Sequence, residues 1–282
     1  MIAGRRDSAS AAASSRLDWA SILVRGEEIV RSYATGVTLR QAFYRLVSAQ
    51  LLPNTKTAYK TLSSRSAQAR RDADFPSLID RTRTIHRRLT FEDTSHALTW
   101  LAGYYRRDRT EGQPFSIYLA VEKNGIVEQL ASWFGHLGLP ILALGGYSSE
   151  SYVERIRDDV EEQDRPAVLL YGGDFDPSGE DIERDFNART QCFQRIVRVA
   201  LTAEQVRSYA LPPNPGKVTD PRAADFIARH GELVQVELDA LDPTDLRALY
   251  QDAIDEFWDG SAHDAAMVRE QQERRHLAEV LR

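Results

Sequence analysis

Residues 169–180 read LLYGGDFDPSGE, and this stretch is the most informative part of the chain. The apolar run from Ala167 to Tyr171 predicts a buried β-strand that ends at a pair of glycines. Pro177 suits the first turn of a helix, because proline lacks the N–H that this position leaves unpaired. Asp174 and Asp176 are therefore expected on a strand-to-helix loop. In an open α/β sheet, such loops form the edge where ligands bind.

A third acidic residue follows a second predicted strand. Residues 117–121 are apolar, and Glu122 and Lys123 come directly after them. Two carboxylates as close as Asp174 and Asp176 repel each other unless a proton or a cation neutralises them, and their oxygens suit Mg²⁺. An alternative is that Asp176 only caps the helix while Asp174 is solvated. Glu122 at a matching strand end favours a Mg²⁺ site formed by Glu122, Asp174 and Asp176.

The composition is that of a globular protein of two domains, with 282 residues, 42% of them hydrophobic and 28% charged. The single cysteine, Cys192, excludes an internal disulfide framework and a multi-cysteine zinc site. No apolar run has the length of a membrane span. The Ser/Ala-rich residues 1–16 lack a hydrophobic segment and are expected to form a disordered tail. We therefore expect a cytoplasmic protein, associated with the nucleoid through DNA.

Charge is distributed unevenly along the chain. The formal net charge is −6, but residues 1–90 contain 16 Lys/Arg against 7 Asp/Glu, and the remainder contains 20 against 35. A basic first domain would bind DNA phosphates, while an acidic second domain would hold cations. A solvated surface with uneven charge is the alternative interpretation.

The N-terminal part has the pattern of a small DNA-binding domain. The spacing of apolar residues predicts helices over residues 17–33, 39–49 and 55–71, and residues 75–89 are expected to form a short strand pair. Three helices and a wing are typical of a winged-helix domain, which lays one helix in the major groove. The residues expected to contact DNA are Lys56, Lys60, Arg65, Arg70, Arg81 and Arg83, together with Lys123 of the second domain.

Strands and helices alternate after a boundary near residue 112. The predicted strands cover residues 117–121, 139–144, 167–171 and 193–200, with helices between them. This alternation predicts a parallel α/β sheet. A further strand is expected over 231–238, and helices over 243–258 and 262–281. The expected organisation is a tail (1–16), a winged-helix domain (17–110) and an α/β domain with C-terminal helices (111–282).

Arg40 and Tyr44 share one face of the second predicted helix, because they are four residues apart. A tyrosine attacks a phosphate only when its proton is removed or the phosphate is strongly polarised. An arginine can polarise that phosphate through a bidentate contact. A core tyrosine beside a solvent-facing arginine is the alternative, and spacing alone favours it.

The motifs together resemble a known family. A glutamate after one parallel strand, with Asp-x-Asp-Pro-x-Gly after a later one, resembles the Toprim domain of topoisomerases, primases and some nucleases. RQAFY at residues 40–44, ahead of these motifs, resembles the Arg-Asp-Ile-Tyr-Tyr motif of the topoisomerase VI A subunit and its meiotic break-forming relatives. Residues 146–147 and 236–241 resemble two further family segments. Gln41, Phe43 and residues 148–149 depart from the family pattern.

The resemblance implies a homodimer that cleaves double-stranded DNA with Mg²⁺. Tyr44 takes the place of the family nucleophile, which forms a 5′-phosphotyrosyl link, and Arg40 takes the place of the motif arginine. Glu122, Asp174 and Asp176 take the places of the metal ligands. Nothing in the chain resembles an ATP-binding module, so the resemblance implies cleavage, with a separate ATPase subunit as a further candidate partner.

Two alternatives remain open. One is a hydrolytic Toprim nuclease, of the kind found in defence systems or mobile elements, in which Tyr44 is structural. The other is a non-catalytic DNA-binding subunit.

Overall fold

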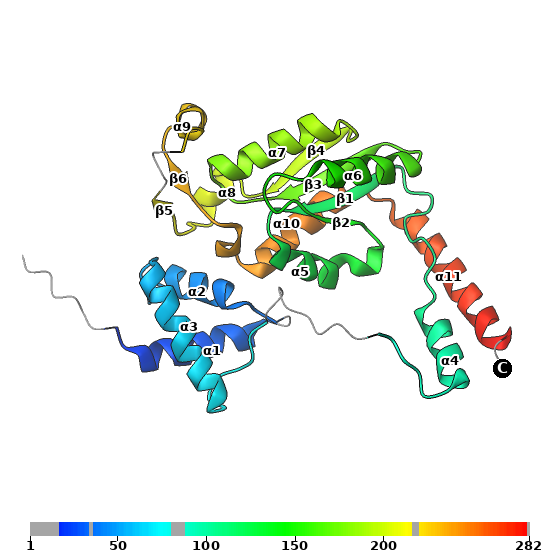
Figure 1. Ribbon diagram of the computed structural model, residues 1–282, viewed down its shortest axis with the longest axis horizontal. Helices are drawn as coiled ribbons and strands as arrows, with labels where there is room; N and C mark the ends of the chain where they lie inside the picture. The colour runs from blue at the N-terminus through cyan, green and yellow to red at the C-terminus, as the bar shows by residue number, and fades with distance from the viewer. Residues whose placement is uncertain (1–16, 34–35, 80–87, 216–219, 281–282) are drawn as a thin grey trace, which may run out of the picture. The chain divides into compact units, whose positions relative to one another are not determined.

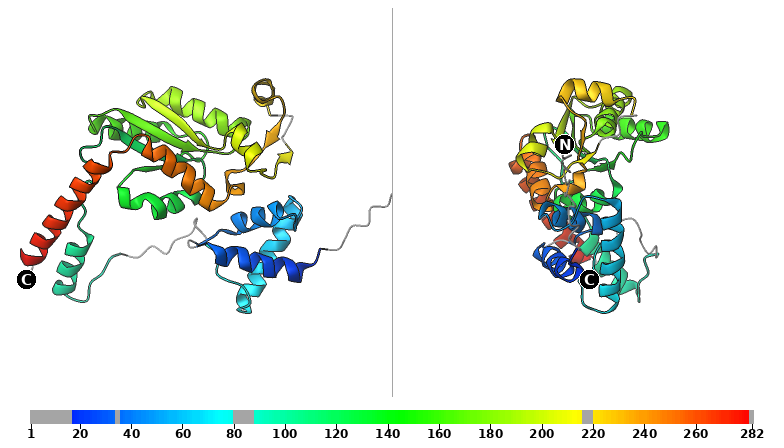
Figure 2. Two further views of the ribbon diagram at one scale, coloured as in Figure 1. Left: turned by 180° about the vertical axis from the view of Figure 1, so that it is seen from behind. Right: turned by 90° about the vertical axis from the view of Figure 1, so that its left-hand side faces the viewer.

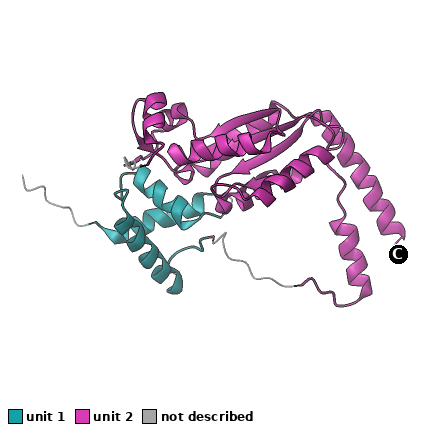
Figure 3. Cartoon of the chain, turned by 45° about the horizontal axis from the view of Figure 1, so that its top comes forward, with its two compact units in different colours: residues 1–78 teal, residues 79–282 magenta. Residues whose placement is uncertain are grey.

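Two compact units, residues 1–78 and 79–282, make up the chain (Figure 3). The computed structural model describes residues 17–33, 36–79, 88–215 and 220–280. The predicted tail (1–16), Arg81 and Arg83 lie outside the described residues.

The first unit contains the three predicted helices, α1 (Trp19–Ser32), α2 (Leu39–Ser48) and α3 (Lys56–Arg71). Each begins at a residue whose side chain accepts hydrogen bonds from the first turn: Asp18, Thr38 and Thr55, respectively. Their packed centre is formed by Val30, Ala42 and Phe75, with Leu23, Ala69 and Leu78 against it. Most residues of the predicted wing, 80–87, are outside the described part, so the winged-helix assignment stays a prediction.

The first unit ends at Leu78, earlier than the boundary expected near residue 110. Helix α4 (Thr94–Tyr104) packs against α11 (Gly260–Val280) of the second unit (Figure 1). The segment after α4 is attached to α11 as well, because Arg109 forms a bidentate ion pair with Glu270. The sequence could not show this attachment, since its two partners are 161 residues apart.

The second unit is built on a four-stranded sheet in the order β2-β1-β3-β4, with every neighbouring pair parallel. The strands are β1 (Ser116–Val121), β2 (Ile141–Ala143), β3 (Ala167–Gly172) and β4 (Arg195–Ala200). All residues of β1 and β3 are buried, as expected for central strands covered on both faces. The predicted parallel α/β sheet is confirmed.

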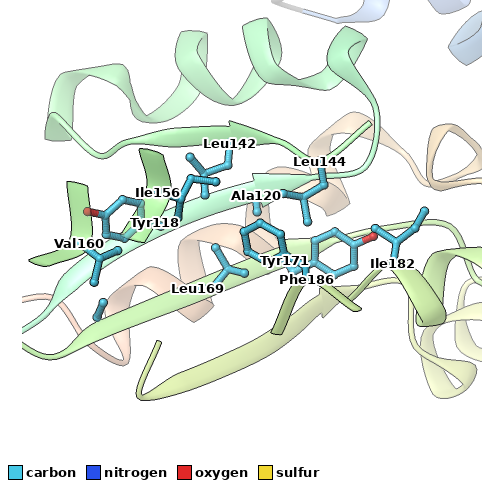
Figure 4. Close-up of a cluster of buried hydrophobic side chains, with 11 residues drawn as sticks. Tyr118, Ala120, Leu142, Leu144, Ile156, Val160, Leu169, Tyr171, Ile182 and Phe186 are labelled. Atoms are coloured by element: carbon cyan, nitrogen blue, oxygen red, sulfur yellow. The ribbon is translucent and has the colours of Figure 1, made fainter. Parts of the chain in front are cut away.

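Helices cover both faces of this sheet. Helices α6 (Glu150–Glu162) and α7 (Pro177–Thr190) lie on one face, while α5 (Asn124–Phe134) and α10 (Pro243–Asp255) lie on the other (Figures 1 and 2). The core on the α6/α7 side contains aromatic and aliphatic side chains from β1, β3, β2 and the residue after β2 (Figure 4). They are Tyr118, Ala120, Leu142, Leu144, Ala167, Leu169 and Tyr171, packed on Ile156, Val160, Ile182 and Phe186. On the opposite face, Tyr250 of α10 donates a hydrogen bond to the Ala120 carbonyl, 2.8 Å away.

The strand order places a switch point between β1 and β3. From β1 the chain moves outward to β2 on one side, and from β3 it moves outward to β4 on the other. The crossover helices α5 and α7 therefore leave β1 and β3 toward opposite faces, which opens a crevice beyond the carboxyl ends of these two strands. The predicted acids follow these two strands.

The C-terminal part differs from the prediction in one segment. The strand expected over 231–238 is reduced to β6 (Val234–Gln235), paired with β5 (Asn214–Pro215) and followed by the 3₁₀ turn η2 (Leu238–Ala240). The remaining elements are η1 (Gly135–Leu137), α8 (Ala203–Ser208) and α9 (Ala223–His230). Among the described residues, none of the helices combines the length and the apolar character needed to cross a lipid bilayer.

Candidate active site

Glu122 and the Asp174 loop are joined directly at the switch point. Val121 and Gly172 are register partners, so β1 and β3 end at the same level. The Glu122 N–H donates to the Gly172 carbonyl at 3.0 Å, and the Asp174 N–H donates to Glu122 Oε2 at 3.0 Å. Two acids that are 52 residues apart in sequence are thus hydrogen-bonded neighbours in the fold.

Glycines make this close approach sterically feasible. A Cβ atom at Gly179 would lie 2.3 Å from the Asp174 carbonyl oxygen and 3.3 Å from Glu122 Oε2. A Cβ atom at Gly172 would lie 2.5 Å from the Tyr250 hydroxyl oxygen, and one at Gly173 would lie 2.4 Å from the Tyr171 hydroxyl oxygen. The glycines of the GGDFDPSG motif are therefore required by packing.

Asp174 is the most deeply buried of the three acids, with 8% of its surface exposed. Its Oδ1 accepts a hydrogen bond from the Leu238 N–H at 2.8 Å and lies 3.0 Å from Lys123 Nζ. Burial raises the pKa of Asp174 to about 7, and the neighbouring Glu122 adds to the rise, whereas Lys123 opposes it. Burial also raises the pKa of Glu122. The positive charge of Lys123 therefore does not fully offset the cost of burying these two carboxylates in their ionised form.

Asp176 caps α7, as the simpler of the two interpretations predicted. Its Oδ1 accepts a hydrogen bond from the Gly179 N–H at 2.7 Å. The cap does not exclude a second role, because it uses only one of the two carboxylate oxygens. Asp176 is also close enough to Glu122 to contribute to the raised pKa of that residue.

Residues 236–241, which resemble a family segment but had no side-chain role assigned from the sequence, complete the site. Phe175 and Val236 form an antiparallel bridge with backbone hydrogen bonds of 2.8 and 3.0 Å. This bridge places Glu237 and Asp239 beside Lys123, whose Nζ lies 2.7 Å from Glu237 Oε2 and 3.6 Å from Asp239 Oδ2. The sequence signal was the VELDAL stretch at 236–241, with two acids at alternate positions.

Lys123 was expected to contact DNA, but its ammonium group is held by carboxylates. Burial lowers the pKa of Lys123, but Asp174, Asp239 and Glu237 outweigh this effect and raise it above the ordinary value. The side chain is 23% exposed. This arrangement favours an internal role over a phosphate contact.

The donor set fits Mg²⁺ in chemistry, since every candidate ligand is a hard carboxylate oxygen. Within the part of the chain that the structure describes, no group of three or more Asp, Glu, His or Cys side chains is arranged to hold a metal ion. The contacts explain why: Asp174 and Asp176 each direct one oxygen to a backbone N–H, and Lys123 lies against Asp174. Metal binding at Glu122, Asp174 and Asp176 would thus require these side chains to rotate.

Two further residues at this edge had no role assigned from the sequence, although residues 146–147 resemble a family segment. Arg198 of β4 donates to the Asp174 carbonyl at 2.7 Å and pairs with Glu183 at 2.7 Å, which anchors the acidic loop. Tyr147, in the loop after β2, is 57% exposed, and its hydroxyl is hydrogen-bonded to Asp181 and to Arg222, the latter at 2.9 Å.

Tyr44 lies in the first unit, on the packed side of α2, and is 5% exposed. Its ring makes an edge-to-face contact with Phe43, at 5.4 Å between centroids. Arg40 is exposed one turn earlier on the same helix. The burial of Tyr44 matches the core-tyrosine alternative better than it matches an attacking group.

The described basic residues of α3 are mostly solvent-accessible. Lys56, Lys60 and Arg65 are exposed, and the Arg65 guanidinium lies 5.2 Å from the Trp19 ring centroid. Arg70 is partly buried. The first three are thus placed to meet phosphates.

No family model matches the sequence, and no curated protein matches it significantly.

Proposed function

We propose that this protein is a Mg²⁺-dependent enzyme that cleaves duplex DNA, with its active centre at the carboxyl ends of β1 and β3. One observation carries this proposal: the direct hydrogen bond from the Asp174 N–H to Glu122 Oε2 at the switch point of a parallel sheet. It joins Glu122 to the loop that carries Asp174 and Asp176. Burying Glu122 and Asp174 as like charges side by side opposes stability, and a bound cation would offset that cost.

Glu122, Asp174 and Asp176 would hold the ion. Bound there, Mg²⁺ would polarise a phosphate oxygen and stabilise the leaving oxygen. The residues of the chain have separate tasks. Arg198 holds the Asp174 carbonyl, so the loop carrying both aspartates keeps its shape when charge changes nearby. Lys56, Lys60 and Arg65 supply phosphate contacts from the first unit.

Water is the nucleophile that the geometry favours. A nucleophilic hydroxyl must reach the phosphate, and the Tyr44 side chain is 5% exposed on the packed face of α2. A hydrolytic nuclease therefore fits better than a tyrosine transesterase. The transesterase is the second candidate because exposed Arg40 lies one helical turn from Tyr44, where an arginine would bind the same phosphate.

A homodimer remains part of the proposal, because one centre in each of two symmetry-related subunits would cut both strands of a two-fold symmetric duplex. A separate ATPase subunit would be needed only for strand passage. Sedimentation of the purified chain with and without a duplex oligonucleotide tests the dimer.

The function is tested by incubating the protein with supercoiled plasmid across a Mg²⁺ titration, with Asp176→Asn and Asp185→Asn as a matched pair. Asparagine caps a helix as well as aspartate does, so Asp176→Asn should fold normally while losing cleavage and Mg²⁺ affinity. Asp185 also lies on α7, where it pairs with Arg189 at 3.4 Å, and Asp185→Asn should cleave like the wild type. Equal cleavage by both variants, or cleavage in excess EDTA, would refute the proposal. No cleavage of any duplex by the wild type would favour the non-catalytic subunit.

A further inference from the structure

Lys123 is surrounded by three carboxylates from two separate segments of the second unit, the loop after β3 and the stretch after β6. Its Nζ lies 3.0 Å from Asp174 Oδ1, 2.7 Å from Glu237 Oε2 and 3.6 Å from Asp239 Oδ2. The Asp174 and Asp239 side chains are only 11% and 10% exposed. An ordinary surface ion pair joins one cation to one anion in solvent, so this arrangement calls for a different explanation.

The backbone fixes these partners in place before the lysine side chain is considered. Lys123 is the N-cap residue of α5, directly after Glu122. The Phe175–Val236 bridge and the hydrogen bond from the Leu238 N–H to Asp174 hold the C-terminal segment against the acidic loop. Without a cation beside them, Asp174 and Asp239 would be unneutralised charges with little access to water, which is costly, and the more exposed Glu237 would add a third negative charge.

The geometry around the Nζ atom resembles that of a bound cation more than that of a DNA-binding lysine. An ammonium group has three donors and no acceptor, and here three carboxylates face it. A lysine that reaches for DNA would keep its ammonium group in solvent to meet a phosphate. Here the side chain is 23% exposed, and the charge is directed into the protein.

We infer that Lys123 is a resident cation of the active centre and occupies the position that a second divalent ion would otherwise take between Asp174, Glu237 and Asp239. The centre then holds one exchangeable Mg²⁺, at Glu122, Asp174 and Asp176, beside one fixed ammonium group. The assignment of that single Mg²⁺ rests on the proposed function. The role of Lys123 rests only on its own three contacts.

The inference is tested by counting the Mn²⁺ ions that bind to each chain of the wild type and of Lys123 variants. Mn²⁺ is a paramagnetic substitute for Mg²⁺ at oxygen sites. Lys123→Met removes the charge and keeps most of the stem. Electron paramagnetic resonance titration should find one more Mn²⁺ per chain in Lys123→Met than in the wild type. Lys123→Arg, which keeps a cation, and Lys60→Met, which removes an exposed lysine of the first unit, should show no additional ion. Adding Glu237→Gln to Lys123→Met should weaken the additional site at least tenfold, because it removes one of the three carboxylates.

The melting temperature of Lys123→Met provides a second measurement, because the unneutralised carboxylates are expected to destabilise this variant. The variant should then melt at a lower temperature than the wild type without divalent ions, and millimolar Mn²⁺ should restore most of the loss. An unchanged ion count in a folded Lys123→Met would overturn the inference, and so would a variant that stays unfolded in Mn²⁺. The proposed function fails separately: a wild type that binds no Mn²⁺ at all refutes the Mg²⁺ site, whereas the gain of one ion on removing Lys123 would still stand.

Discussion

Gly179→Ala should destabilise the protein and disturb the proposed active centre, although helix propensity alone predicts a more stable protein. Gly179 lies in the first turn of α7, and replacing a helical glycine by alanine usually stabilises a helix by about 0.5–1 kcal/mol. Here the added Cβ would lie 2.3 Å from the Asp174 carbonyl oxygen, a distance that real Cβ contacts essentially never show. The two effects have opposite signs, so their sizes decide the outcome.

The structure gives the size of the steric effect. Separating the Cβ from the Asp174 oxygen to even 3.0 Å requires a movement of at least 0.7 Å, and the obstacle is backbone rather than a flexible side chain. Overpacking of this kind costs about 1–3 kcal/mol, which exceeds the gain in propensity. We therefore expect a net loss of roughly 1–2 kcal/mol. Cleavage should fall about 100-fold, because a displacement near 1 Å of a catalytic group has that effect.

Urea unfolding of Gly179→Ala beside Gly125→Ala measures this difference. Gly125 occupies the early part of α5, after the other strand of the site, and nothing lies within 4 Å of a Cβ built there. Gly125→Ala should therefore be neutral or more stable than the wild type. A Gly179→Ala protein as stable and as active as Gly125→Ala would refute the reasoning.

Three other outcomes are expected. The pKa of Asp174 is raised from 3.8 to about 7, so in the absence of Mg²⁺ the protonated side chain contributes stability below pH 4 that is lost as the pH rises toward 7. Asp174→Asn should lack this component when the free energy of unfolding in urea is measured against pH. Tyr44→Phe should cleave DNA at close to the wild-type rate, and neither protein should become covalently attached to labelled DNA. If the wild type forms such an adduct and Tyr44→Phe loses both the adduct and cleavage, the tyrosine is the nucleophile. Replacing Lys56, Lys60 and Arg65 by alanine should reduce the slope of log K against log salt by about 2–3, since each phosphate contact contributes about 0.9; an unchanged slope would place the DNA elsewhere.

The parts of the fold that sequence predicted are those in which the pattern is local. The apolar runs at β1 and β3 end in Glu122 and in the Asp174 loop, and parallel strands of one sheet deliver such residues to one edge. The predicted edge was right for this reason. The helices of the first unit were equally readable, because caps such as Thr38 precede regular apolar spacing.

The expectation that Tyr44 is a nucleophile came from the family resemblance and not from the local pattern. Its position relative to Arg40 depends only on the helical period, and the structure keeps that spacing on α2. This spacing alone favoured a core tyrosine beside a solvent-facing arginine. The side chain proved to be buried, with the Phe43 ring edge-on to it.

The remainder of the candidate site could not be predicted, because it depends on pairings between distant segments. The Leu238 N–H reaches Asp174 across 64 residues, and Lys123 reaches Glu237 across 114. The strand that carries this segment, β6, has only two residues, too few to give a period. A lysine after a buried strand predicts a charge at the sheet edge, but not the direction in which that charge points. Here it points toward the acids, so the same residue that looked like a DNA contact lies 3.0 Å from Asp174 and 2.7 Å from Glu237. If the proposed Mg²⁺ site exists, this ammonium group would limit how many divalent ions it can hold.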